Sequence, residues 1–130
     1  MKTSFTTSDL IPSDSSTLYH AWLNSTAHSA MTGGEAECSE ELGAAFTAWD
    51  GYIQGSNVSL SPVEEIVQRW RTDDFNEEDE DSVITVHFKD TADGCLLTLT
   101  HTQIPDGQPD YKQGWDDHYF TPMKQYFEKP

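Results

Sequence analysis

The sequence predicts an α+β fold, in which a curved antiparallel sheet of about seven strands wraps around a long C-terminal helix. Three observations lead to this expectation. The chain has 130 residues, about the size of one domain, so residues 1–130 are interpreted as a single domain. The middle of the chain alternates polar and apolar residues as strands do, and its C-terminal end spaces aromatic residues as a helix does. A sheet with one apolar face must be covered, and the terminal helix is the element able to do so.

The N-terminal part is expected to hold a first strand at residues 3–7 and then two short helices. Ser13 or Asp14 can cap the first helix, whose apolar residues fall on one face. A second helical segment at 26–31 ends at Gly33-Gly34, because paired glycines interrupt and reverse the chain.

The middle of the chain is predicted to form consecutive antiparallel strands. The expected strands are residues 44–49, 52–60, 63–71, 82–89 and 94–102. Asp50-Gly51 is a strong hairpin signal between the first two, and residues 91–94 form a turn between the last two.

One segment is strongly acidic. Residues 73–81 include seven Asp or Glu side chains, and like charges at that density cannot pack together. A solvated, mobile loop is therefore expected. A calcium site is the alternative, but the segment lacks the glycine and the alternating oxygen ligands of a calcium-binding loop.

The last element is predicted to be a helix that Asp106 or Asp110 caps, with Pro109 in its first turn. Aromatic and apolar side chains recur along it every three or four residues and form one stripe. The stripe consists of Tyr111, Trp115, His118, Tyr119, Pro122, Met123, Tyr126 and Phe127. Pro122 removes one backbone hydrogen bond, so we expect a bend near His118.

Charge and composition exclude several classes of protein. Seven basic residues against 23 acidic ones give a net charge of −16, which disfavours binding to nucleic acid or to anionic membranes. The same acidity also fits plain solubility or a saline cell interior. No apolar run suggests a signal peptide or a membrane span, so a cytoplasmic protein with reduced Cys38 and Cys95 is expected.

Four segments together resemble a known family. They are WDGYIQG at 49–55, IVQRWR at 66–71, LTLTH at 97–101 and GWDDHYFTPMKQYF at 114–127. In this order they resemble the C-terminal domain of the activator of the heat shock protein 90 ATPase, within the START-like (SRPBCC) superfamily. The resemblance covers nearly the whole chain. It implies a helix-grip fold with a seven-stranded sheet, two short helices and a C-terminal helix that encloses a cavity.

Some members of the superfamily are enzymes, but a non-catalytic protein is expected here, with two alternatives for its role. One is a co-chaperone-like protein that associates with the heat shock protein 90 chaperone. The other is a binder or carrier of a small apolar ligand in the cavity. A cyclase-like or hydrolase-like enzyme is a third hypothesis that rests on superfamily analogy alone. The eukaryotic co-chaperone has an additional N-terminal domain that contacts the chaperone, and we expect no counterpart here, which separates the fold from ATPase activation.

Inward-facing residues are the candidates for lining the cavity. They are Trp22, Met31, Phe46, Trp49, Tyr52, Trp70, Phe88, Leu99, Tyr119 and Met123. Ligand pockets are mostly apolar, which favours these side chains as a lining. A filled core demands the same apolar pattern, so periodicity does not separate the two interpretations.

Ionisable residues give weaker signals. His101 and His118 could approach each other near Tyr119 and transfer protons. However, no histidine pair has the spacing of metal ligands, and a buried histidine is usually a hydrogen-bonded core residue, so no catalytic residue, metal or cofactor is assigned. Arg69 and Arg71 share the outer face of their strand, where they either contact a partner or offset local acid. An acidic chaperone would be encountered slowly unless salt screens the repulsion.

Overall fold

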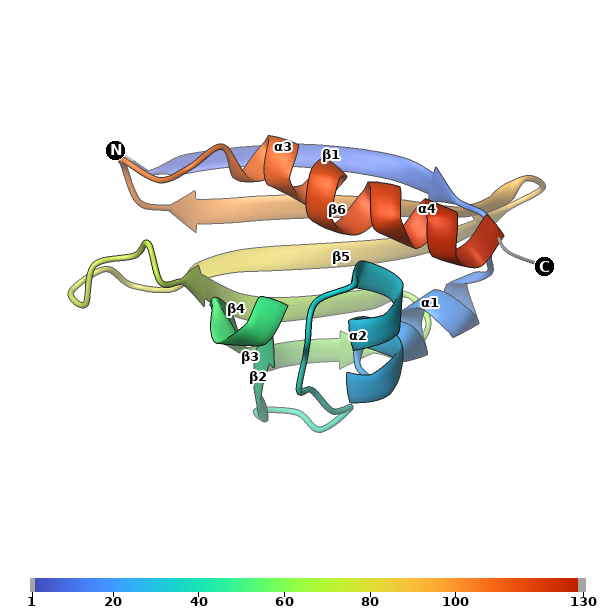
Figure 1. Ribbon diagram of the computed structural model, residues 1–130, viewed down its shortest axis with the longest axis horizontal. Coiled ribbons are helices and arrows are strands. Elements are labelled where there is room, and N and C mark those ends of the chain that lie inside the picture. Colours follow the sequence, from blue (N-terminus) through green and yellow to red (C-terminus); the bar gives the residue numbers. More distant parts are fainter. Residues whose placement is uncertain (1, 129–130) are drawn as a thin grey trace.

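The computed structural model describes residues 2–128 as one antiparallel sheet with helices on a single face (Figure 1). The six strands lie in the order β1-β6-β5-β4-β3-β2. They are β1 (Thr3–Ile11), β2 (Ala45–Ala48), β3 (Ile53–Ser61), β4 (Glu65–Thr72), β5 (Ser82–Thr91) and β6 (Gly94–Ile104). The helical elements are α1 (Ser15–Trp22), α2 (Ser25–Thr32) and a C-terminal helix built from α3 (Tyr111–Trp115), a π turn (Asp116–Phe120) and α4 (Thr121–Glu128).

Both short helices begin and end at residues suited to those positions. The Asp14 carboxylate, one of the two predicted caps, accepts a hydrogen bond from the backbone N–H of Thr17 at 2.8 Å and caps α1. Asn24 caps α2 in the same way. Gly33 ends α2 with φ at 87°, a left-handed conformation in which a side chain would be strained.

The predicted alternation is confirmed in the central strands. Every second residue of β6 from Cys95 to His101 is buried, and β5 shows the same pattern from Ile84 to Phe88. The predicted turn joins them, with Thr91 opposite Gly94. The first strand is longer than predicted because β1 pairs with β6 as far as Ile11.

The expected count of seven strands is wrong for the described residues, which form six. The segment between α2 and β2 makes only one isolated bridge, in which Glu37 and Thr47 exchange backbone hydrogen bonds of 3.0 and 2.9 Å. Buried Ala36 and half-buried Cys38 alternate here with exposed Glu35 and Glu37, but the segment pairs with β2 only at this bridge.

The C-terminal helix contains a π turn where a bend was predicted. The backbone N–H of Thr121 bonds to the carbonyl of Asp116, five residues earlier, just before Pro122. The extra residue in this turn brings both Tyr119 and Phe120 into the core, although Phe120 lies off the predicted stripe. Asp110 is the cap, so Pro109 precedes the helix instead of lying in its first turn.

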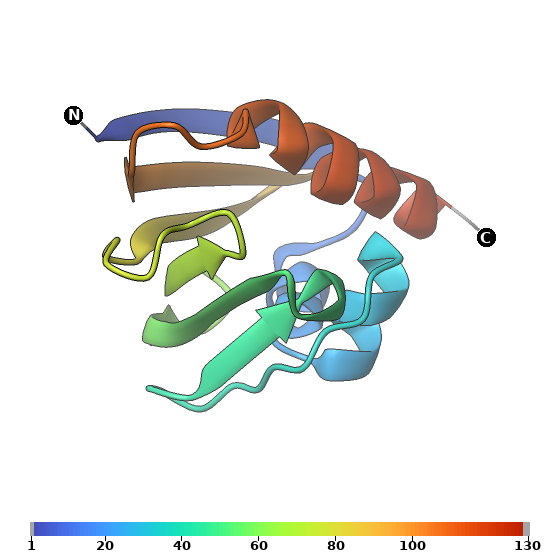
Figure 2. The same cartoon turned by 60° about the vertical axis from the view of Figure 1, so that its left-hand side comes forward.

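The helices close the concave face of the sheet. The C-terminal helix lies along β1 and contacts α2, while α1 packs against β5 and α2 (Figure 2). The buried side chains form one apolar core between the helices and the sheet. None of the helices within residues 2–128 has the length and apolar character needed to cross a lipid bilayer.

The acidic segment is organised by one arginine. Its carboxylates are mostly exposed, as predicted, but Phe75 is buried beneath it. The Arg71 guanidinium forms an ion pair of 2.8 Å with Asp81 and donates hydrogen bonds to the carbonyls of Asn76 and Asp79. Arg71 therefore offsets local acid, whereas Arg69 is exposed on the outer face of the sheet.

Candidate ligand pocket between the sheet and the C-terminal helix

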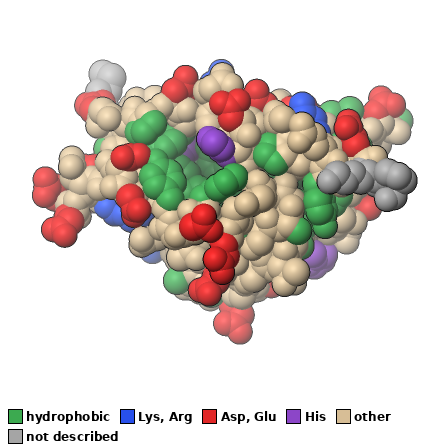
Figure 3. Space-filling view, viewed as in Figure 1, with side chains coloured by type: hydrophobic (Ala, Val, Ile, Leu, Met, Phe, Trp, Pro, Cys, Tyr) green, Lys and Arg blue, Asp and Glu red, His purple; other side chains and the backbone are tan. Residues whose placement is uncertain are grey.

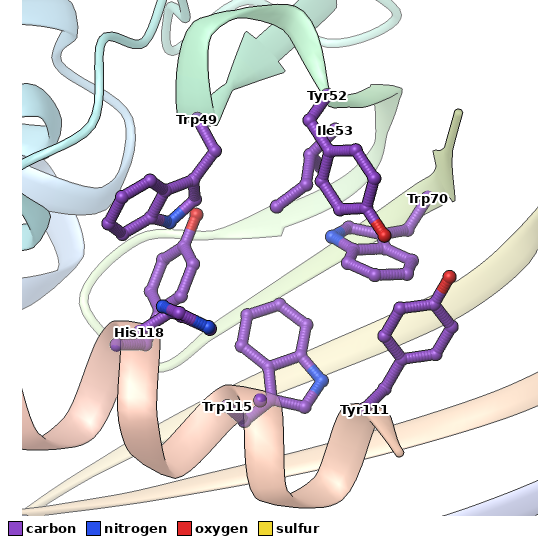
Figure 4. Close-up of a pocket in the computed structure, with 9 residues that line it drawn as sticks. Trp49, Tyr52, Ile53, Trp70, Tyr111, Trp115 and His118 are labelled. Atoms are coloured by element: carbon purple, nitrogen blue, oxygen red, sulfur yellow. The ribbon is translucent and has the colours of Figure 1, made fainter. Parts of the chain in front are cut away.

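A pocket of about 270 Å³ opens between the C-terminal helix and the β2–β3 turn (Figure 4). Its lining consists of Trp49, Tyr52, Ile53, Trp70, Tyr111, Gly114, Trp115, His118 and Tyr119. Indole and phenol rings from the turn, from β4 and from the helix face one another across the hollow. The volume is slightly below the ~300–1,000 Å³ typical of ligand sites, which indicates a small ligand.

A strained turn holds Trp49 at the mouth of this pocket. Trp49 and Asp50 have φ angles of 50° and 59°, a left-handed region that a bulky side chain such as tryptophan rarely adopts. The indole packs over Gly34, where an added Cβ would lie 2.5 Å from the ring. Backbone and side-chain hydrogen bonds between Glu35 and Asp50 fix the turn in this position. The Trp49 and His118 rings also form an edge-to-face pair, with their centroids 5.3 Å apart.

Hydrogen-bonded tyrosines form one end of the pocket. The Tyr52 hydroxyl donates to the Asp74 carboxylate. The Tyr111 hydroxyl donates to Gln108 and lies 2.7 Å from the Thr72 hydroxyl. Burial raises the pKa of both tyrosines, and the bond to Asp74 raises that of Tyr52 further, so both hydroxyls stay protonated at neutral pH.

The floor of the pocket rests on a buried histidine. The Trp115 indole N–H donates to Nδ1 of His101 at 3.1 Å, so the ring proton lies on Nε2, which donates to the Ser82 hydroxyl at 2.8 Å. Ser82 in turn donates to the carbonyl of Trp70. Burial lowers the pKa of His101 to about 3, so this histidine is neutral.

A second buried histidine holds Tyr119. His28 Nδ1 donates to the carbonyl of Trp22 at 2.7 Å, which leaves Nε2 to accept a 2.7 Å hydrogen bond from the Tyr119 hydroxyl. Burial lowers the pKa of His28, consistent with a neutral ring. The histidine beside Tyr119 is thus His28, whereas His101 and His118, expected to approach each other there, have other partners.

The structure divides the ten predicted cavity residues into two groups. Trp49, Tyr52, Trp70 and Tyr119 line the pocket. The others lie in the buried core away from this lining, and they are Trp22, Met31, Phe46, Phe88, Leu99 and Met123. The lining residues absent from the prediction are Ile53, Tyr111, Gly114, Trp115 and His118. Three of these five belong to the predicted helical stripe, so the signal for them was present in the sequence.

The surroundings of the pocket are apolar at the centre and acidic at the rim. Figure 3 shows hydrophobic side chains and a histidine around a hollow, with acidic side chains bordering it. No lysine or arginine lines the hollow. Within residues 2–128, no group of three His, Cys, Asp or Glu side chains is placed to hold a metal ion.

Comparison with known proteins identifies relatives across most of the chain. A family model described as "Activator of Hsp90 ATPase homolog 1-like protein" matches residues 13–128. An "Activator of 90 kDa heat shock protein ATPase homolog" from Dictyostelium discoideum is 33% identical over 113 residues, covering 84% of this chain and 29% of the relative. The human "Activator of 90 kDa heat shock protein ATPase homolog 1" is 29% identical over 111 residues, covering 85% and 32%. The chain therefore spans about a third of the length of these relatives.

Solved structures show the same fold. An HSP90 activator from Plasmodium falciparum superposes with a TM-score of 0.86 at 24% identity, over 98% of this chain and 97% of that one. A Chromobacterium violaceum protein superposes with a TM-score of 0.77 at 21% identity, over 98% and 99%. At these identities the likeness establishes the architecture alone.

Proposed function

The chain belongs to the family of activator of Hsp90 ATPase homologue 1-like proteins, and from this premise we propose that it is a co-chaperone-like protein that associates with an Hsp90-type chaperone. The observation that carries the proposal is the family match, which runs from the cap of α1 through α4. The match includes the whole C-terminal helix and the β2–β3 turn. A cytoplasmic location is part of the same proposal.

Association and ATPase stimulation are separate parts of this proposal. The matched relatives are about three times as long as this chain, so their activity belongs to proteins with additional sequence. We therefore assign association to this chain first and a change in ATP turnover second. Both are measurable with the chain as it is.

The test is a titration of an Hsp90-type chaperone with this protein, following binding by calorimetry and ATP turnover by phosphate release. We expect saturable binding and a turnover that changes in proportion to the bound fraction. A chaperone ATP-site inhibitor provides the background rate. Absence of binding at saturating concentration in 0.15 M salt (about physiological ionic strength) would overturn the proposal, and binding with unchanged turnover would restrict it to association.

Salt dependence gives this titration a second readout. The chain carries a net charge of −16, so an acidic partner is repelled at long range. The Debye length falls from about 30 Å at 0.01 M salt to about 8 Å at 0.15 M. We expect the association rate to rise across that interval, whereas steering between opposite charges would make it fall.

We further propose, as a second candidate, that the chain binds a small apolar ligand in the pocket. The supporting observation is the hollow of about 270 Å³, which the surrounding rings leave unfilled beside the apolar core. Protein interiors are normally close-packed, so an apolar hollow of this size is available to a ligand. A rise in the thermal unfolding midpoint with a bicyclic aromatic compound tests this candidate, and no rise with any such compound would contradict it.

A further inference from the structure

We propose that the pocket takes an uncharged ligand that presents an oxygen acceptor, such as a carbonyl group, to the indole N–H of Trp70. This inference rests on the ligand-binding candidate above and specifies the chemistry of its ligand. Three features of the pocket support it. They are an accessible indole donor without a protein partner, an imidazole at the mouth that also makes no hydrogen bond within residues 2–128, and open space at a helical glycine.

The Trp70 indole N–H is the strongest feature. Trp70 is only 3% exposed, and its Nε1 makes no hydrogen bond within residues 2–128. The Trp49 N–H also lacks a partner, but it is enclosed by the protein, whereas the Trp70 N–H remains accessible. Trp70 lines the hollow, and Figure 4 shows its indole nitrogen at the end of the side chain that is turned toward the middle of the hollow. The small accessible part of this buried residue therefore includes a donor that opens into the pocket.

Neighbouring rings hold this donor in place. The Trp70 ring packs edge-to-face on Tyr111 and on His101, with centroids 4.9 and 4.6 Å away. It also contacts Trp115, with centroids 5.4 Å apart. Close packing on these rings prevents the indole from turning toward an acceptor elsewhere in the protein. Since buried polar groups are nearly always paired, the acceptor for this N–H must come from within the hollow.

Water suits this position less well than an oxygen carried on a ligand. A bound water needs about two to four polar partners. The hydroxyls of the three lining tyrosines already donate to groups outside the hollow, namely Asp74, Gln108 and His28. Most of the wall consists of rings, so a mostly apolar ligand with one acceptor matches the hollow.

The His118 imidazole is the second feature. It is exposed at the mouth, forms an edge-to-face pair with Trp49 and makes no hydrogen bond within the described part of the chain. An imidazole keeps at least one N–H in either protonation state, and its other nitrogen accepts a hydrogen bond when the ring is neutral. His118 therefore accommodates either kind of polar group at the mouth, and Trp70 is the residue that selects an acceptor inside.

Charge around the pocket favours an uncharged acceptor. Acidic side chains border the hollow (Figure 3), and the chain carries a net charge of −16. Both repel a carboxylate, and among the described lining residues His118 is the only basic side chain that could offset them. An ammonium group is attracted by the acidic rim but brings N–H donors to the Trp70 donor. A carbonyl oxygen supplies the acceptor without either penalty.

Gly114 provides the space for a ligand. It lies in α3 with an ordinary helical backbone, and a Cβ added there would have no heavy atom within 4 Å. Neither conformation nor contact therefore requires glycine at this position, although glycine weakens a helix. Gly114 lines the pocket, and its missing side chain leaves open the part of the hollow that it borders.

The test uses four naphthalenes of similar shape and the whole protein. They are 2-acetylnaphthalene, its carbon isostere 2-isopropenylnaphthalene, the anion 2-naphthoate and the cation 2-naphthylmethylammonium. Affinity is measured by fluorescence titration. We expect the ketone to bind about three- to tenfold more tightly than its isostere, the range of one net hydrogen bond, and more tightly than either ion.

The indole N–H resonances give a direct readout in the unaltered protein. The Trp70 resonance should lie further downfield with the ketone than with the isostere, because the ring currents of the two probes are alike and only the ketone accepts a hydrogen bond. The other three indoles are internal controls, since Trp22 and Trp115 already donate to protein acceptors and Trp49 is enclosed. Their resonances should differ little between the two probes.

Three variants locate the contact. Trp70→Phe removes the N–H but keeps a ring, so the ketone and its isostere should bind equally. His118→Phe is the matched control, because it also replaces a nitrogen-bearing ring of the lining but should leave the preference for the ketone unchanged. Gly114→Leu fills the open space and should weaken every probe at least tenfold, with an unchanged NMR fold fingerprint. The comparison of ketone and isostere in the unaltered protein stands on its own if a variant fails to fold.

The outcomes distinguish this inference from the candidate on which it rests. Equal affinity for ketone and isostere, or tightest binding of either ion, overturns the inference and leaves ligand binding intact. A preference for the ketone that survives Trp70→Phe but disappears in His118→Phe places the acceptor at the imidazole and also overturns it. Undiminished binding to Gly114→Leu places the ligand elsewhere, with the same consequence. If no probe binds at its solubility limit, the ligand-binding candidate and this inference fall together.

Discussion

The interior has a filled half and a hollow half, and both are made of apolar residues. In the filled half, β5 and β6 face α1 and α4 through side chains that are at most 4% exposed, including Leu18, Phe88, Leu97 and Met123. In the hollow half, β4 and the β2–β3 turn face α3 and the π turn across the pocket. The two halves share one sheet and one terminal helix (Figure 1).

The difference between the halves is shape and not hydrophobicity. The filled half contains many branched and flexible aliphatic side chains, which can interdigitate as close-packed protein interiors do. The hollow half is dominated by rigid rings that hydrogen bonds hold at fixed angles, such as Trp115 on His101 and Tyr119 on His28. A ring held in this way cannot rotate to fill the space that Gly114 leaves.

The largest expected effect tests this comparison with two substitutions that remove side chains of equal size, one from each half. Leu97→Ala removes a fully buried side chain from β6 and should lower the free energy of unfolding by about 3–5 kcal/mol. Ile53→Ala removes an aliphatic side chain of the same size from the pocket wall and should cost about 2 kcal/mol, because Ile53 already has a void on one side. Denaturant unfolding measures both, and equal losses would contradict the division.

A smaller effect concerns the histidine at the floor of the hollow half. Between pH 6.5 and about 3 the unfolded chain protonates His101 while the folded chain does not, because the folded pKa is about 3. Stability is therefore lost as the pH falls below about 6.5. At pH 5 the loss from this residue is roughly 2 kcal/mol, from 1.36 kcal/mol per pH unit.

The measurement compares denaturant unfolding at pH 7 and pH 5 in the unaltered protein and in His101→Gln. The variant should lose about 2 kcal/mol less on acidification, since it no longer has this group to protonate. His87→Gln, at an exposed position on the outer face of β5, controls for the removal of a histidine. Identical acid sensitivity in the unaltered protein and the His101 variant would show that the ring is accessible to protons in the folded state.

Much of the fold could be predicted from the sequence because it depends on periodic burial. The alternation from Cys95 to His101 and the aromatic spacing from Tyr111 to Met123 each identify an element and its inner face. The π turn could not be predicted from that pattern. It adds one residue to a helical period, and Phe120 consequently becomes buried although the stripe excludes it.

The candidate site was less predictable, since inward-facing residues share one pattern whether they fill a core or line a hollow. Trp49 and Phe46 both face inward, yet only Trp49 reaches the pocket, through a left-handed turn that the Asp50-Gly51 signal does not specify. Gly114 is the opposite case. It was visible in the sequence, but its meaning depends on the space around its missing Cβ, which requires coordinates.

The smallest expected effect tests whether the glycine at position 114 lowers the stability of the helix while it leaves the pocket open. Gly114→Ala adds a methyl group to a helical position where it meets no heavy atom within 4 Å, so it should not clash. Alanine loses less backbone entropy than glycine on folding into a helix, so the variant should be more stable by about 0.5–1 kcal/mol. Thermal and denaturant unfolding measure the gain, with Gly33→Ala as the matched control.

Gly33 also has open space around its absent Cβ, but its φ of 87° should make the same substitution destabilising. A loss of stability in Gly114→Ala would show that the helix requires glycine there for its own packing, and the hollow would then be a consequence of that packing and not space kept for a ligand.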